Sequence, residues 1–154
     1  MNSHETKVKE FLSSNNVKAE HFVFNQSCHS VKEAAEAVNG SESDFVKNIC
    51  MIDSNNELIV AIVKGNNRAS TTRVAKSLNI EKPRLANGNE IIERTGFPPG
   101  GVPSFGFQAN FLVDPKVTNM DYIYTGGGSE NSLVKINVQD LLKINQGTII
   151  KVSK

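Results

Sequence analysis

The stretch FVKNICMID (45–53), followed closely by ELIVAIVKG (57–65), is the strongest indication of β-structure in the sequence. Both runs are rich in β-branched and other apolar residues, which favour strands. The short polar segment between them, Ser54-Asn55-Asn56, is typical of a turn. The pattern therefore predicts a β-hairpin over residues 45–65.

A lysine interrupts the first of these two runs. If Val46 and Asn48 share one face of the strand, Lys47 points to the other face together with Phe45 and Ile49. A lysine among apolar neighbours either extends its ammonium group to the surface or lines a cavity. In a cavity it would be a cation directed at a carbonyl or phosphate group of a ligand. The neighbouring residues leave both placements open.

Further elements are expected on both sides of the hairpin. Ser30-Val-Lys-Glu33 is a capping-box pattern, and Gly40 closes the helix that follows it. Other helices are predicted near Val8–Leu12, over 70–78, over EIIERT (90–95) with a cap at Asn89, and over VQDLLKIN (138–145); strands are predicted over 21–25, 83–87, 111–113, 121–125, 133–137 and 147–152. Because helices and strands mix without strict alternation, we expect an α+β fold: a mixed, strongly curved, barrel-like sheet with helices packed outside.

Length and composition are those of a globular chain. The 154 residues suit one domain over 1–154, and 38% hydrophobic with 21% charged residues argues against disorder. No apolar run approaches the roughly 20 residues of a membrane span. The polar N-terminal segment does not resemble a signal peptide. We therefore expect a cytoplasmic protein without membrane contact, either a monomer or a homodimer.

The cysteines and histidines offer little support for a metal or thiol centre. Cys28 and Cys50 match no zinc spacing, and the three histidines show none either, so we expect no metal ion and no cofactor. Cys28 and His29 together look like half of a thiol catalytic pair. Adjacent side chains rarely point at each other, however, and a nucleophile needs its base within hydrogen-bond reach. A cysteine-dependent hydrolase acting on a small metabolite stays as an alternative function.

One segment is strongly basic although the net charge of the chain is only +1. Between residues 64 and 84 a single acid, Glu81, stands among Lys64, Arg68, Arg73, Lys76, Lys82 and Arg84. This density suits contact with phosphate groups. A solvated helix face beside a loop would have the same composition, so both interpretations stay open.

Two segments concentrate glycine: TGFPPGGVPSFG (95–106), which is also rich in proline, and TGGGSEN (125–131). The first lacks the Lys-Ser or Lys-Thr of a phosphate-binding loop, and the second lacks the strand–turn–helix setting of a dinucleotide site. Glycine allows a chain to approach a ligand closely, and proline fixes that approach. Each segment is thus either a tight loop or a shaped backbone surface for a ligand.

Five motifs occur in a characteristic order along the chain. They are SVKEAA (30–35), FVKNI (45–49), KGNNR (64–68), GFPPGGVPSFG (96–106) and YTGGG (124–128). From about residue 20 to the C-terminus, this set closely resembles the YbaK family, also called the prolyl-tRNA synthetase-associated or insertion domain family. The resemblance implies a free-standing aminoacyl-tRNA deacylase. Such an enzyme would hydrolyse the ester of a mischarged small amino acid, of the alanine or cysteine type, on tRNA(Pro).

The resemblance also implies roles for individual residues. Lys47 matches the functional lysine of the family and would orient the ester or stabilise its developing negative charge. The implied substrate-binding residues are Ser30, Asn48, Gly100, Gly101, Val102, Pro103, Ser104, Gly126, Gly127 and Gly128. Backbone N–H groups of the 100–104 loop would hold the carbonyl oxygen. Water, assisted by a hydroxyl of the terminal ribose, would attack without a metal ion or a protein nucleophile.

The implied partner is the 3′ end of an aminoacylated tRNA. Its phosphates would meet the cations Lys64, Arg68, Arg73 and Lys76. An aminoacyl-tRNA synthetase is a further expected partner. The main alternative is a non-catalytic module of the same fold that binds tRNA or a synthetase without hydrolysis.

Overall fold

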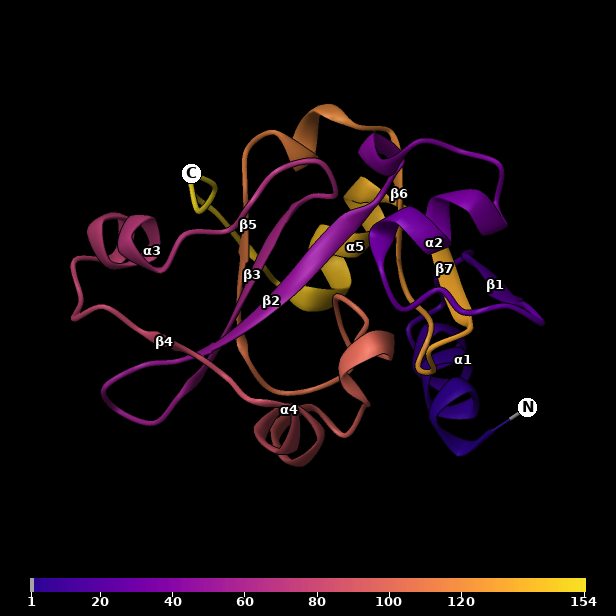
Figure 1. The fold of residues 1–154 in the computed structure, drawn as a ribbon, viewed down its shortest axis with the longest axis horizontal. Helices are drawn as coiled ribbons and strands as arrows, with labels where there is room; N and C mark the ends of the chain where they lie inside the picture. The colour runs from indigo at the N-terminus through magenta and orange to yellow at the C-terminus, as the bar shows by residue number, and fades with distance from the viewer. Residues whose placement is uncertain (1) are drawn as a thin grey trace.

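The computed structural model describes residues 2–154 and contains two sheets flanked by helices (Figure 1). The strands run in the orders β1-β7-β6 and β4-β2-β3-β5-β8. Their bounds are β1 Glu20–Val23, β2 Val46–Ile52, β3 Leu58–Lys64, β4 Arg84–Leu85, β5 Asn110–Val113, β6 Tyr122–Gly126, β7 Ser132–Asn137 and β8 Thr148–Ile149. The helices are α1 Ser3–Ser14, α2 Val31–Ala37, α3 Thr71–Leu78, α4 Gly88–Thr95 and α5 Val138–Asn145, with short 3₁₀ turns η1 Glu42–Asp44, η2 Pro99–Gly101 and η3 Val117–Asn119.

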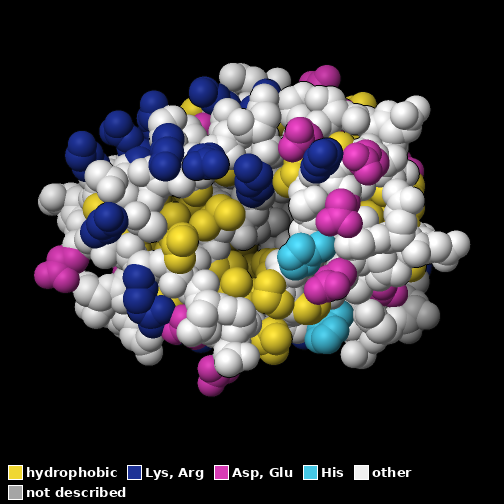
Figure 2. Space-filling view, viewed as in Figure 1, with side chains coloured by type: hydrophobic (Ala, Val, Ile, Leu, Met, Phe, Trp, Pro, Cys, Tyr) yellow, Lys and Arg dark blue, Asp and Glu magenta, His cyan; other side chains and the backbone are white. Residues whose placement is uncertain are grey.

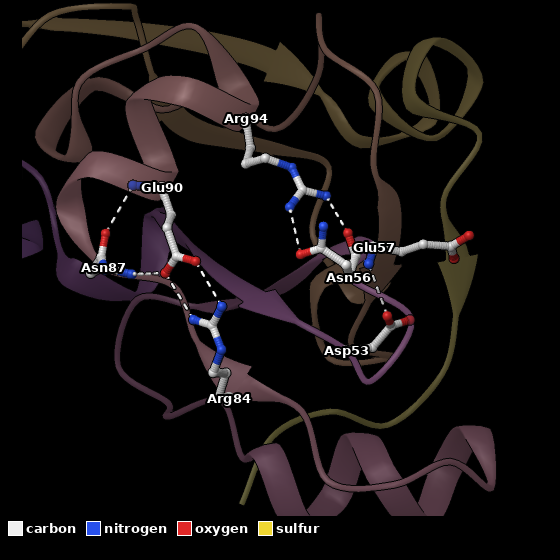
Figure 3. Close-up of polar contacts among 7 residues, drawn as sticks. All are labelled: Asp53, Asn56, Glu57, Arg84, Asn87, Glu90 and Arg94. Atoms are coloured by element: carbon white, nitrogen blue, oxygen red, sulfur yellow. Dashed lines mark hydrogen bonds and ion pairs between the residues drawn. The ribbon is translucent and has the colours of Figure 1, made fainter.

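The predicted hairpin is confirmed and lies at the centre of the larger sheet. All of β2 pairs antiparallel with all of β3. In the turn, the Asp53 carboxylate accepts the N–H groups of Asn55 and Glu57, each at 2.9 Å. Figure 3 shows the bond to Glu57. Asn56 has a φ of 63°, in the left-handed region that asparagine tolerates better than most residues. The turn therefore fixes the register of the two strands.

The two faces of β2 alternate as the sequence predicts. Val46 and Cys50 belong to the main core between the sheets and α5. Ile49 and Met51 belong to a second cluster that includes α3. Each fully buried side chain of this size stabilises the fold by about 1.5–3 kcal/mol. The alternation places Lys47 on the α3 side of the sheet.

The α+β class is confirmed, but the expected barrel-like sheet is wrong. Both sheets are open, and within residues 2–154 one isolated bridge, between Phe45 and Tyr124, links them. Past this bridge, buried Ala34 and Ala35 of α2 pack in one cluster with Phe45 and Leu133. α2 thus covers this junction, and within residues 2–154 no further strand pairing joins the two sheets into a barrel.

The start of α4 also differs from the prediction. Asn87, not Asn89, caps the helix: its side chain accepts the Glu90 N–H at 2.9 Å, and its own N–H donates to the Glu90 carboxylate at 3.0 Å. Arg84 of β4 donates two hydrogen bonds to the same carboxylate, at 2.8 and 2.7 Å (Figure 3). The Arg84 guanidinium and the Asn87 N–H lower the pKa of Glu90 to about 2. This fork joins β4 to α4.

The last strand is shorter than the predicted 147–152 segment. After Ile149 the chain leaves the sheet because the buried Asp114 carboxylate accepts the N–H groups of Val152 and Ser153, each at 3.0 Å. Ser153 then forms an isolated bridge with Ala69. The C-terminus therefore lies beside the segment that leads into α3 (Figure 1). Within residues 2–154, no helix combines the length and the apolar character that a membrane span requires.

Candidate functional site

A pocket of about 190 Å³ opens between the first half of β2, the segment that leads into α2, and the loop around η2. Figure 2 shows a hollow in this face of the molecule, bordered by hydrophobic, basic and histidine side chains. Lys47 and Gly100, although far apart in the sequence, both line the pocket. The other lining residues are Cys28, His29, Ser30, Val31, Ala34, Phe45, Val46, Asn48, Ile49, Pro99, Val102, Thr125, Gly126 and Leu133.

Lys47 brings a cation to this pocket. Its side chain is half-buried, and its Nζ donates a hydrogen bond of 3.0 Å to the backbone oxygen of Asn67. Within the described chain, no carboxylate lies close enough to Lys47 to form an ion pair. An ammonium group has three donors, so two are left after the bond to Asn67. They suit a carbonyl or phosphate oxygen of a ligand.

The loop around η2 offers backbone N–H groups, but not all of those expected. Gly101 donates its N–H to the Pro98 oxygen at 2.9 Å, and its own oxygen accepts the Gly128 N–H at 2.9 Å. The N–H groups of Gly100 and Val102 make no such bond within residues 2–154. Gly100 and Val102 are therefore the available donors, and Gly101 supports the loop instead.

A saturated polar cluster holds the loop against β2. The Asn48 side-chain amide donates to the Val102 oxygen at 3.0 Å and to the Thr125 hydroxyl at 2.9 Å. The Asn48 side-chain oxygen accepts a hydrogen bond of 2.5 Å from the Ser104 hydroxyl. The hydroxyl oxygens of Ser104 and Thr125 lie 2.8 Å apart. Ser104 is fully buried. Asn48 and Ser104, expected at the substrate, are thus placed to hold the loop in position.

The remaining predicted residues divide between the pocket and its support. Gly126 lines the pocket, and a Cβ there would lie only 2.3 Å from the Val102 oxygen. Gly127 and Gly128 are buried behind it. Pro103 is buried and faces a different cavity, beside α1. The final glycine loop therefore reaches the pocket at Gly126 and otherwise forms a tight backbone contact.

The segment before α2 contributes Ser30 and Cys28 to the pocket. Ser30 lines the pocket, as expected, and also caps α2 by accepting the Glu33 N–H at 3.1 Å. Cys28 lines the pocket too, but burial, followed by the nearby Glu33 carboxylate, raises the pKa of its thiol. A protonated thiol is a poor nucleophile. No hydrogen bond joins Cys28 to His29 within the described residues, so the thiol-hydrolase alternative lacks its catalytic pair.

An apolar wall of the pocket was not predicted. It consists of Val31, Ala34, Phe45, Ile49 and Leu133. The capping box predicted α2 and the strand pattern predicted β2, but neither pattern says that these elements face each other across a pocket. That arrangement depends on tertiary packing at the junction of the two sheets.

Basic side chains border one side of the hollow, over α3 and the loop before it (Figure 2). The expected residues of this basic rim are Lys64, Arg68, Arg73 and Lys76. The C-terminal segment adds to it, because the Lys154 N–H donates to the Arg68 oxygen at 2.9 Å and the Ser77 hydroxyl donates to the Lys151 oxygen at 2.7 Å. Lys151 and Lys154 are exposed there. Sequence order alone did not place them beside the rim.

Comparison with known proteins identifies the family of this chain. Residues 25–144 match the model of the aminoacyl-tRNA editing domain. A proline–tRNA ligase of Geotalea daltonii is 24% identical over 106 residues, which are 69% of this chain and 18% of the ligase. The crystal structure of the hypothetical protein APE2540 aligns with a TM-score of 0.89 at 27% identity, covering 96% of this chain and 99% of that one. A crystal structure of a candidate trans-editing enzyme for prolyl tRNA synthetase aligns with a TM-score of 0.89 at 21% identity, covering 100% of this chain and 99% of that one. The chain therefore belongs to the aminoacyl-tRNA editing domain family, as its resemblance to the YbaK family predicts.

Proposed function

We propose that this chain, acting as one domain in trans, hydrolyses the ester bond of a mischarged aminoacyl-tRNA. The observation that carries the proposal is the convergence of the Lys47 ammonium and the Gly100 loop on one small pocket. A synthetase pocket excludes a similar or smaller amino acid poorly, since one methylene is worth only about 1–3 kcal/mol. A second pocket that hydrolyses what fits it supplies the missing selectivity.

In the proposed reaction, backbone and ammonium donors stabilise the charge that develops on the ester oxygen. The Lys47 ammonium and the N–H groups of Gly100 and Val102 bind the carbonyl oxygen, and a water molecule attacks the carbonyl carbon. A hydroxyl of the terminal ribose accepts a proton from the attacking water and passes its own proton to the neighbouring ester oxygen of the ribose. The ester bond then breaks, and the ribose oxygen that leaves is protonated. Each preorganised donor of this kind contributes about 2.7–4 kcal/mol to the lowering of the barrier. The route uses no metal ion and no protein nucleophile.

We further propose that the substrate carries a small amino acid, of the alanine or cysteine type, on tRNA(Pro). The pocket volume of about 190 Å³ leaves little room beyond a small side chain once the ester and ribose have entered. The apolar wall that includes Ala34 and Leu133 suits a side chain without charge. The similarity to a segment of a proline–tRNA ligase supports the assignment to tRNA(Pro).

A panel of charged tRNAs tests this function. Purified protein is incubated with Ala-, Cys-, Ser-, Thr- and Pro-tRNA, and the loss of the labelled ester is followed over time. We expect the alanine or cysteine ester on tRNA(Pro) to be cleaved fastest, and the correct proline ester to be spared. Tight tRNA binding without cleavage of any ester would overturn the deacylase proposal. It would support the alternative, a non-catalytic module that binds tRNA or a synthetase.

The basic rim is proposed to contact the tRNA phosphates. Replacing both Arg68 and Arg73 by Gln should weaken tRNA binding and flatten its salt dependence. Each lost phosphate contact lowers the slope of log K against log salt concentration by about 0.7–0.9, so the double variant should lose roughly 1.5. The binding constant is measured from 50 to 200 mM salt by filter binding or fluorescence anisotropy. Lys143→Gln, on the exposed side of α5, is the control that should leave the slope unchanged; an unchanged slope in the double variant would contradict the phosphate role.

A further inference from the structure

The two sides of the pocket differ in charge. Opposite the basic rim, Figure 2 shows histidine and acidic side chains beside the hollow. His29, which lines the pocket, places its Nδ1 3.6 Å from a carboxylate oxygen of Glu130. Their side chains are 56% and 62% exposed, and Glu130 lies beside the pocket, next to the lining residue His29.

This pair lies directly against Gly100. A Cβ built on Gly100 would come within 2.3 Å of the His29 Nδ1 and 3.0 Å of the Glu130 Cγ. The proposed function assigns the Gly100 N–H to the ester carbonyl. In an aminoacyl ester, the α-nitrogen is bonded to the carbon next to that carbonyl. The α-amino group of a substrate bound in this way lies two bonds from the carbonyl carbon, within reach of the His29 and Glu130 side chains that pack against Gly100.

We propose that Glu130, positioned beside His29, binds the α-ammonium group of the aminoacyl ester. The inference rests on the proposed function and assigns the polarity of the substrate within the site. The basic rim attracts phosphate oxygens, and both the rim and the Lys47 ammonium repel another ammonium group, whereas the Glu130 carboxylate attracts it. The opposite charges at the two ends of the aminoacylated terminus thus fix its direction in the pocket.

Glu33, a second acidic residue near the pocket, has different contacts. Glu33 accepts a hydrogen bond of 3.2 Å from the Ser30 hydroxyl and belongs to α2. It makes no contact with Gly100 of the kind that Glu130 makes. Glu33 therefore serves as a matched control for the charge of Glu130.

The assignment implies a substrate class: esters whose α-nitrogen is a free primary amine. Acylation of that nitrogen removes its positive charge and adds bulk against His29. Peptidyl and other N-acylated esters should consequently be poor substrates. An editing enzyme with this property would act on newly charged tRNA and leave nascent chains intact.

The test compares two esters of one tRNA: the aminoacyl ester that the panel shows to be cleaved fastest, and its α-hydroxy counterpart, in which a hydroxyl replaces the amine. The wild type should prefer the aminoacyl ester in kcat/KM. Glu130→Gln should lower kcat/KM about tenfold for the aminoacyl ester, as the loss of a charged hydrogen bond does, and leave the α-hydroxy ester within about twofold. Glu33→Gln should leave the preference of the wild type unchanged.

Other outcomes discriminate between the two proposals. If Glu130→Gln changes both esters equally, or neither, the ammonium site is overturned while the deacylase function stands. If Glu33→Gln removes the preference as fully as Glu130→Gln does, the assignment to Glu130 is also overturned. If the wild type cleaves no ester in the panel, the proposed function fails and this inference fails with it.

Discussion

Lys47→Met is expected to lower kcat/KM for ester hydrolysis by about 10²–10³-fold, as the loss of a single preorganised donor to a developing oxyanion does. The substitution removes the ammonium and keeps most of the apolar stem. Lys47 makes one hydrogen bond, to the backbone oxygen of Asn67. The loss of one such half-buried bond costs about 0.5–1.5 kcal/mol, so the protein should stay folded.

Single-turnover deacylation separates the chemical step from binding in this experiment. Lys32→Met provides a control, since Lys32 is an exposed lysine of α2 that does not line the pocket. The control should keep the activity of the wild type, and denaturant unfolding should show that all three proteins are folded. Activity of Lys47→Met within about threefold of the wild type would remove this lysine from the mechanism, because one lost donor is worth far more.

Gly126→Ala is expected to damage both stability and activity. The new Cβ would lie 2.3 Å from the Val102 oxygen, 2.7 Å from the Val102 carbonyl carbon and 2.9 Å from the Gly101 carbonyl carbon. These are backbone atoms, so the clash is relieved only when the whole loop moves. Overpacking of this kind costs about 1–3 kcal/mol of unfolding free energy. A shift of about 1 Å in the N–H groups of Gly100 and Val102 would lower activity about 10²-fold.

Gly88→Ala is the matched control for this substitution. A Cβ at Gly88 meets its nearest neighbour, the Pro99 Cγ, at an ordinary contact distance of 3.7 Å. Gly88 begins α4, where alanine is a better helix former by up to about 1 kcal/mol. Urea unfolding and deacylation rates of both variants check the prediction. Wild-type stability together with wild-type activity in Gly126→Ala would show that the contact between Gly126 and the loop is not needed.

The local patterns in the sequence predicted the elements of the site better than their arrangement. The alternation of β2 correctly separated Lys47 from the main core because a strand repeats every two residues. The closure of the sheet could not be predicted in the same way. It involves the junction where α2 and Phe45 pack with Leu133, which is distant in sequence from both.

The resemblance to a family placed residues near the site without giving their contacts. Asn48 follows the lysine and Ser104 lies in the loop, yet both use their side chains to join β2 to that loop. Conversely, nothing in the sequence around Glu130 predicts a role for this acid in the site. Its position against Gly100 arises only when the final glycine loop folds back on the loop around η2. Residue type alone does not distinguish the residues that hold the loop from those that face the pocket. Their hydrogen bonds and their contacts with residues distant in sequence do.

The central claim is that Lys47 and the loop around η2 bind the acyl oxygen of the substrate in one pocket. A crystal structure of the protein with a non-hydrolysable aminoacyl-adenosine, in which an amide replaces the ester, tests this claim most directly. The proposed function predicts that the acyl oxygen lies within about 3.2 Å of the Lys47 Nζ and of at least one N–H group of Gly100 or Val102. An analogue bound with its acyl group outside this pocket, or with its carbonyl turned away from both the ammonium and the loop, would contradict the claim.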